Sequence, residues 1–138
     1  MNLSFNGNEL YKGFNLVTSI VPSSAIKHIL QGIRFEVVET GFKPVCTLTA
    51  TDLEVLVKYT LSAKECVGDG SIVLPAVRVN NILREWAGNE EVLVSFDGTV
   101  ETGLKPVSTC ILKSGKGHFK IAGEDSSQFP MITITDVK

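Results

Sequence analysis

The same order of predicted helices and strands occurs twice along the chain. This duplication limits the possible folds more than any other feature of the sequence. Apolar spacing and turn residues predict strand, helix, strand, strand and strand in the first half, and the same order in the second. The segments 41–45 (GFKPV) and 103–107 (GLKPV) also match, and each precedes the same strand of its half. Alone, two turn-forming segments this short could match by coincidence, but the shared element order argues against that.

The first half begins with a predicted strand at residues 3–5 and a helix from a cap at Asn8 to about Ile20. The apolar residues of this helix recur every three or four positions and share one face: Leu10, Phe14, Val17 and Val21. Three strands are then predicted at residues 32–38, 45–50 and 54–61.

The second half repeats this plan with a strand at residues 71–74 and a helix from Pro75 to about Ala87. The apolar face of this helix is formed by Val79, Ile82, Leu83 and Trp86. Strands follow at residues 92–96, 107–112 and 117–122. We therefore predict an α+β domain of residues 1–130, with antiparallel sheets and both helices on one face. Residues 131–138 are predicted to begin the connection to a second domain.

Composition and charge limit where in the cell the protein is expected and whether it binds membranes or nucleic acid. No apolar run approaches the roughly 18 residues of a membrane helix, and the first residues lack the features of a signal peptide. We therefore expect a cytoplasmic protein with no membrane partner. The net charge of -2 argues against a nucleic-acid-binding arm that relies on bulk positive charge. Any DNA contact must come from a local basic face.

Residue types that could support catalysis or metal binding are few. His28 and His118 lie in no recognisable catalytic motif. Asp52 and Glu54 could share a strand face as functional carboxylates do, but a turn-capping Asp52 and a solvated Glu54 are favoured. The segment 114–117 (SGKG) lacks the flanking residues of a phosphate loop, which favours a hairpin turn. Buried free thiols are expected at Cys46, Cys66 and Cys110. We expect no enzymatic activity, cofactor or metal site.

The last predicted strand alternates between basic and apolar positions. Lys116, His118 and Lys120 fall on one face, and the other face holds Gly117, Phe119 and Ile121. An ordinary half-buried strand has this pattern. So does an edge strand that pairs with another subunit, and the pattern alone favours the first interpretation.

Four short motifs occur together along the chain: ATDLE at residues 50–54, LPA at 74–76, SGKGHF at 114–119 and QFP at 128–130. They resemble, in order and approximate spacing, the T-D-L-E, V-P-A, S-G-[RK]-S-[RK]-F and D-F-P motifs of bacterial DNA sliding clamps. The resemblance to the amino-terminal domain of this family, the beta subunit of DNA polymerase III, covers residues 1 to about 132.

The resemblance implies a non-catalytic processivity factor for DNA replication. Clamp subunits of this family have three such domains, and two subunits close head to tail into a ring with helices lining the hole. The implied partners are double-stranded DNA, the third domain of another clamp subunit, and polymerase and clamp loader through domains absent here. Carried over by position, the subunit contact would use Arg78, Ile82, Lys116, His118, Phe119 and Ile121. The resemblance therefore favours the edge-strand interpretation.

The expected DNA contacts rest partly on the family resemblance and partly on positions where this sequence departs from the family pattern. Lys12 and Arg84, on helix surfaces away from the apolar faces, are our candidates for weak phosphate contact, together with Lys27 in a loop. Ordinary surface charge is the alternative for all three. Ser24 stands where the family usually carries a DNA-reaching Arg, so Lys27 or His28 could replace that contact. The stretch 97–106 is also longer than the usual family hairpin.

Two other classes of function are compatible with the residues alone. One is a β-rich ligand-binding or assembly module without a DNA role. The other is a fragment of an enzyme completed by further domains. Two more copies of the strand-helix-strand-strand-strand plan after Lys138 in the parent gene would favour the clamp over both.

Overall fold

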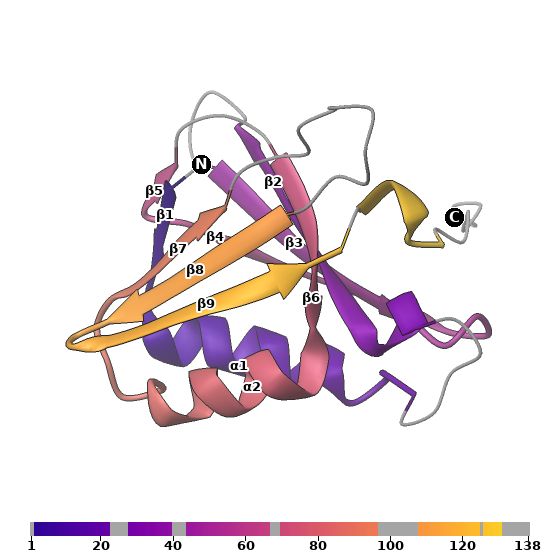
Figure 1. Ribbon diagram of the computed structural model, residues 1–138, viewed down its shortest axis with the longest axis horizontal. Helices are drawn as coiled ribbons and strands as arrows, with labels where there is room; N and C mark the ends of the chain where they lie inside the picture. The colour runs from indigo at the N-terminus through magenta and orange to yellow at the C-terminus, as the bar shows by residue number, and fades with distance from the viewer. Residues whose placement is uncertain are drawn as a thin grey trace.

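Two antiparallel sheets and a pair of helices make up the fold (Figure 1). The computed structural model describes residues 2–22, 28–39, 44–66, 70–96, 108–124 and 126–130. In chain order the elements are β1 (Asn2–Phe5), α1 (Gly7–Thr18), η1 (His28–Gln31), β2 (Gly32–Glu39), β3 (Pro44–Thr51), β4 (Leu56–Ser62), β5 (Glu65–Cys66), β6 (Gly70–Pro75), α2 (Ala76–Glu85), β7 (Val92–Phe96), β8 (Ser108–Ser114), β9 (Gly117–Gly123) and η2 (Ser126–Gln128). The predicted connection at 131–138 lies outside these residues.

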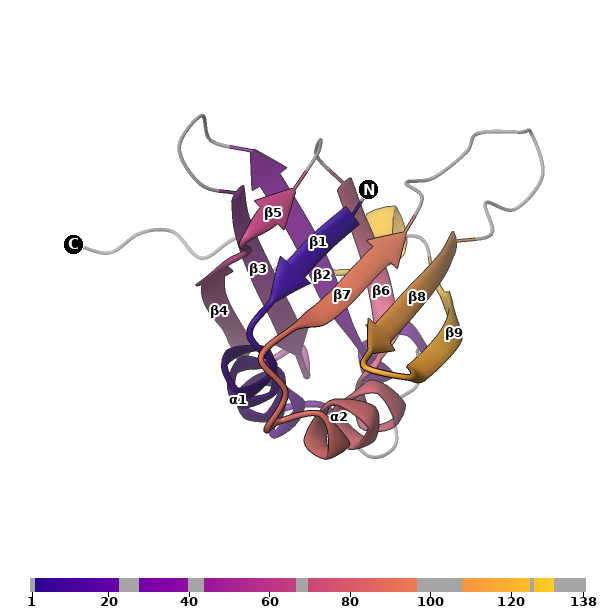
Figure 2. The ribbon, with the colours of Figure 1, turned by 90° about the vertical axis from the view of Figure 1, so that its left-hand side faces the viewer.

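The first strand of each half joins the sheet of the other half. The five-stranded sheet has the order β5-β1-β7-β8-β9, and the four-stranded sheet has the order β4-β3-β2-β6. β1 pairs with β7, and β6 pairs with β2 in the corresponding way. Figure 2 shows both helices side by side along one side of the sheets. The duplicated element order and the placement of both helices on one face are therefore confirmed.

Helix α1 begins two residues earlier than the sequence indicated. Its cap is Asn6, whose side-chain oxygen accepts hydrogen bonds from the amides of Asn8 (3.0 Å) and Glu9 (3.1 Å), so the predicted cap at Asn8 is wrong. Gly7 can begin the helix because its backbone lies against the chain after α2: its amide donates to the Asn89 carbonyl at 3.0 Å. A Cβ at Gly7 would come within 2.3 Å of the Trp86 carbonyl oxygen. The Asn6-Gly7 pair therefore forms the start of the helix.

The two helices pack against each other as well as against the sheets. Leu10, Phe14 and Val17 of α1 are buried on one face, as the spacing predicted. Asn80 of α2 is also buried, and its side-chain amide donates to the Asn15 side-chain oxygen at 3.1 Å. Both helices end about two residues before the predicted ends, at Thr18 and Glu85.

The core lies between the sheets and the helices and is shared by both halves. Phe35 of β2 packs edge-on against two rings of the five-stranded sheet: Phe5 of β1, with centroids 6.0 Å apart, and Phe96 of β7, at 5.9 Å. All three side chains are almost fully buried. Because Phe35 contacts strands from both halves, the two repeats cannot fold as separate units around this cluster.

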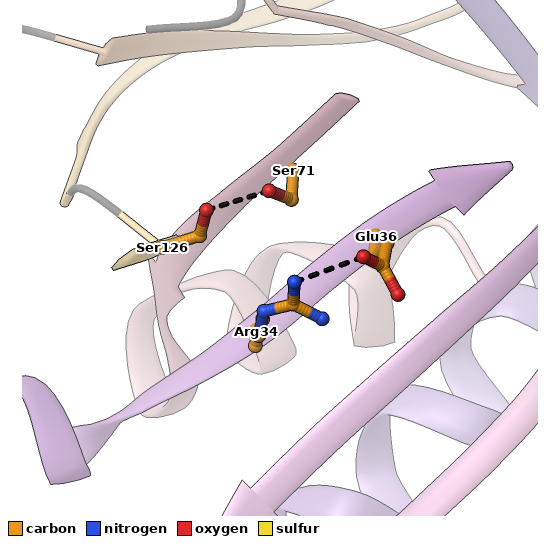
Figure 3. Close-up of polar contacts among 4 residues, drawn as sticks. All are labelled: Arg34, Glu36, Ser71 and Ser126. Atoms are coloured by element: carbon orange, nitrogen blue, oxygen red, sulfur yellow. Dashed lines mark hydrogen bonds and ion pairs between the residues drawn. The ribbon is translucent and has the colours of Figure 1, made fainter. Parts of the chain in front are cut away.

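The outer face of the four-stranded sheet carries polar contacts that reach the end of the described chain (Figure 3). The Arg34 guanidinium donates to the Glu36 carboxylate at 2.9 Å, and both residues lie on β2. The hydroxyls of Ser71 on β6 and Ser126 on η2 are 2.5 Å apart. Backbone hydrogen bonds between Val73 and Glu124 (3.0 and 2.9 Å) complete this attachment. They fix the segment after β9 against β6.

The turn between β3 and β4 confirms the structural interpretation of Asp52. Its carboxylate accepts hydrogen bonds from the amides of Val55 (2.7 Å) and Glu54 (2.9 Å), while the Glu54 side chain is exposed. Leu53 has a φ of 80°, which is unusual for a residue with a branched side chain. This turn delays the start of β4 from the predicted residue 54 to Leu56.

Replacing Asp52 by asparagine is expected to remove a pH-dependent contribution to stability. The amides of Val55 and Glu54 hold the pKa of Asp52 below its ordinary value of 3.8. Because the folded pKa is the lower one, the carboxylate stabilises the fold above the ordinary pKa, and this contribution is lost as the pH falls through the lowered pKa. Thermal melts of wild type and Asp52→Asn from about pH 7 to pH 2 should therefore converge in acid. A gap that stays constant would contradict this assignment.

The side chains of two of the three cysteines are described, and both are buried thiols outside any disulfide, as expected. Burial raises the pKa of Cys110 to about 12, so its reactive thiolate is strongly disfavoured. The side chain of Cys66 lies outside the description. In the described part of the chain, no group of three potential metal ligands occurs, and no helix is long and apolar enough to span a membrane.

Candidate functional site

Strand β9 forms one edge of the five-stranded sheet. It pairs with β8 along its whole length, from Ser114 opposite Gly117 to Ser108 opposite Gly123. Its other side has no strand partner among the described residues, apart from the bridge between Glu124 and Val73 just beyond its end. An edge of this kind presents unpaired backbone donors and acceptors to an incoming strand. In the described part of the chain β9 is therefore an edge strand, and its pairing with another subunit stays a prediction.

A groove of about 980 Å³ runs beside this edge, between β9, the end of β6 and the start of α2. It brings together four of the six residues predicted for the subunit contact, which come from α2 and β9: Arg78, Ile82, Phe119 and Ile121. Lys116 and His118 do not line the groove. Both side chains are exposed in the hairpin that β8 and β9 form. Lys120, which the prediction omitted, does line it.

Phe119 is the main exposed apolar side chain of this edge. It is 43% exposed, and its ring rests against Trp86 at the end of α2 with the centroids 5.5 Å apart. Trp86 approaches closely because the neighbouring strand position is Gly117, where a Cβ would lie 2.8 Å from the indole ring. Phe119 is thus held in place by its own domain while much of its surface stays available to a partner.

Ile121 differs from the prediction that it belongs to an exposed apolar patch. Its side chain is only 5% exposed and packs in the core opposite Cys110. The alternation of β9 places Phe119 and Ile121 on the same face, but α2 and Trp86 end beside Phe119, whereas Ile121 lies nearer the middle of the fold. Ile82 is half-buried and packed against the core, so Phe119 and Val77, which is 64% exposed, supply most of the accessible apolar surface of the groove.

Basic side chains outnumber acidic ones along this edge, although Glu124 also lines the groove. Arg78, Lys116, His118 and Lys120 are exposed, and β8 and β9 contain no aspartate or glutamate. Such an excess of basic side chains favours an acidic partner surface, both for orientation and for the rate of encounter.

The candidate DNA contacts are described only in part. Lys12 on α1 and Arg84 on α2 are exposed, and the Arg84 guanidinium donates to the Asn81 side chain at 3.0 Å. Glu9 and Glu85 are exposed on the same helices, so the charge of this surface is close to balanced. Ser24, Lys27, the side chain of His28 and the long stretch 97–106 lie outside the described residues.

Sequence reasoning missed the supporting role of Trp86, which it assigned to the helix core face. No local pattern marks its contact with Phe119, because the two residues meet only when β9 lies across the end of α2. The glycine at position 117, directly before the basic strand, is the one signal that a neighbouring group comes close.

A duplicated α+β domain with exchanged first strands, two helices on one side and an open strand edge has the architecture of a DNA clamp domain. The match to a family model is specific: residues 1–133 match the DNA polymerase III beta subunit, N-terminal domain, and the chain belongs to this family. No curated protein sequence matches the chain.

Solved structures of bacterial beta subunits have the same fold. The subunit of Thermotoga maritima superimposes with a TM-score of 0.81 at 24% identity, covering 99% of this chain and 34% of that one. The subunit of Streptococcus pyogenes gives 0.81 at 22% identity, with coverage of 100% and 34%. A Helicobacter pylori beta clamp, solved with a DNA ligase peptide, gives 0.80 at 16% identity, covering 99% and 34%. The chain therefore spans about a third of the length of the subunits it resembles.

Proposed function

We propose that this chain acts as one domain of a non-catalytic sliding clamp, which encircles duplex DNA in the cytoplasm and holds a replicative polymerase on it. The family match over residues 1–133 carries the proposal. The open β9 edge supports it, because a ring built from separate subunits needs an edge that a partner can extend. Polymerase and clamp loader would bind through further domains.

The subunit contact would be made by the groove beside β9. A strand of a third clamp domain from another subunit would pair with β9, and its apolar side chains would cover Phe119 and the exposed part of Ile82. Arg78, Lys116 and His118 would face acidic groups of that partner. Ile121 would not touch the partner directly, because its side chain belongs to the core, where it packs beneath the contact surface.

The helices would face DNA without holding it tightly. A sliding ring needs contacts that are weak, depend on phosphate charge and ignore the base sequence. Lys12 and Arg84 can supply such contacts, and the neighbouring Glu9 and Glu85 keep the attraction low.

We expect the isolated domain to bind duplex DNA only weakly, because it cannot encircle the duplex. At physiological salt the dissociation constant should lie in the nonspecific range of about 10⁻⁴ to 10⁻⁶ M and be equal for unrelated sequences. Fluorescence anisotropy with two labelled duplexes over a salt series measures both properties. The double variant Lys12→Ala/Arg84→Ala should bind more weakly with a shallower salt dependence, whereas Lys58→Ala, on an exposed position of β4, should match wild type.

Sub-micromolar binding at physiological salt, or a preference for one duplex, would contradict the proposed clamp role. Loss of binding in Lys58→Ala but not in the double variant would place the contact on the sheet side and exclude the helix surface as the DNA-facing one.

A further inference from the structure

The outer face of the five-stranded sheet, opposite the face that packs into the core, carries a group of basic side chains. Leu112 and Ile121 mark the buried face of β8 and β9. Residues next to these buried positions point to the opposite, outer face of the sheet. Three of them are exposed: Lys113 on β8, and His118 and Lys120 on β9. Lys113 lies directly opposite His118 in the strand pairing, so these groups form one patch.

This positive charge is not balanced within its own strands. Residues 108–123 contain no aspartate or glutamate, although the whole chain has a net charge of -2. Glu91, just before β7, is an acidic group at this sheet, and its carboxylate already accepts a hydrogen bond from the Ser4 hydroxyl at 3.0 Å. Lys113 on β8 and Lys120 on β9 carry the same charge on neighbouring strands, so an acidic ligand would reduce their mutual repulsion.

An apolar hollow lies beside the basic patch on the same outer face. It has a volume of about 180 Å³, and Leu93, Ser95, Ile111 and Lys113 are among the residues that line it. Leu93 is 41% exposed, although it lies within β7, and it is paired directly with Lys113. An exposed leucine flanked by a lysine offers one ligand both an aliphatic contact and a charge contact.

We infer that this outer face binds an acidic segment of another protein, with one aliphatic side chain of that segment in the Leu93–Ile111 hollow and carboxylates beside Lys113 and Lys120. Lys113, Leu93 and Ile111 do not line the β9 groove, whereas Lys120 does, so the two surfaces meet at Lys120. In a ring with its sheets outside, the face stays accessible while the edge of β9 is covered.

Nucleic acid fits this surface less well than an acidic peptide does. A phosphate backbone would use the lysines and leave the aliphatic hollow empty, and single-stranded bases are held mainly by stacking on aromatic rings. No phenylalanine, tyrosine or tryptophan occurs among the described outward positions of β7, β8 and β9, since Phe119 lies on the opposite face against Trp86.

The test is a titration of the domain with the peptide acetyl-Asp-Glu-Leu-Glu-Asp-amide, followed by methyl NMR shifts of Leu93 and Ile111. Saturable shifts at these methyls are expected. The affinity should be weaker in Lys113→Glu, at least about tenfold weaker in Lys113→Glu/Lys120→Glu, and unchanged in Lys58→Glu, which matches the single reversal but lies on β4. Replacing the peptide leucine by serine should weaken binding about tenfold in wild type but little in Leu93→Ser. Circular dichroism of each variant checks that it is folded.

Three results would overturn the inference. One is the absence of saturable shifts, and a second is equal affinity for the leucine and serine peptides. The third is tighter binding of a single-stranded oligonucleotide of equal charge that is lost in the same lysine variants, which would identify a nucleic-acid surface instead. Because Lys120 also lines the β9 groove, the clamp proposal is judged separately with Phe119→Ala, whose side chain lies on the opposite face of β9 from Lys120.

Discussion

Replacing Phe35 with alanine is expected to lower the free energy of unfolding by about 3 to 5 kcal/mol, the usual cost of removing a buried phenylalanine. The side chain is 1% exposed and contacts Phe5 and Phe96, which belong to the other sheet. Because a small domain is stable by only about 5 to 15 kcal/mol, this loss would bring many molecules close to unfolding at room temperature. Urea titration followed by Trp86 fluorescence and by circular dichroism measures it.

Phe119→Ala provides the matched control, since it removes the same atoms from a side chain that is 43% exposed. We expect it to cost about 1 kcal/mol or less. Both variants should unfold in one cooperative transition seen equally by the two probes. Two separate transitions, or a Phe35→Ala loss as small as that of Phe119→Ala, would contradict a core shared by the two halves.

The second large effect concerns partner binding. Phe119→Ala should weaken association with a separately produced third domain of a clamp subunit by roughly five- to thirtyfold, or about 1 to 2 kcal/mol. This is less than full burial of a phenylalanine would give, because part of the ring already packs on Trp86. Isothermal titration calorimetry measures the affinity, and a thermal melt measures the fold.

Val38→Ala is the control for this effect, because Val38 is also 43% exposed but lies on β2 in the other sheet. Its association constant should equal that of wild type. If Phe119→Ala lowers the melting temperature strongly while the folded fraction binds as well as wild type, Phe119 stabilises the domain and does not form the subunit contact.

The periodic elements of the fold could be predicted from the sequence because their apolar residues follow regular spacings. The strand at residues 92–96 matches β7 at both ends, and most other ends agree within about two residues. The exchange of β1 and β6 between sheets could not be predicted, because pairing between distant strands leaves no local pattern. The two-residue strand β5 is too short to show any alternation.

The residues of the candidate subunit contact were predicted mainly from the family resemblance. The structure shows which of them are accessible and which are buried. Alternation along β9 correctly places His118 and Lys120 on the other face from Phe119 and Ile121, while Lys116 lies in the turn before the strand. The alternation does not indicate which of these apolar side chains helix α2 and the core cover. The sequence therefore did not predict that Ile121 is buried. The roles of Lys12 and Arg84 in DNA contact stay predictions, as do those of Ser24 and Lys27.

Hydrogen exchange of the β9 backbone tests most directly whether this edge joins a partner clamp domain. The domain would be measured alone and with a saturating third clamp domain, residue by residue. We predict that alternate amides of Gly117–Gly123 gain protection on binding, because a new strand pairs with every second residue of an edge. The amides of β4, the edge of the other sheet, should not change. Protection at β4 instead of β9, or binding that leaves the amides of both edges unchanged, would contradict the proposed ring contact.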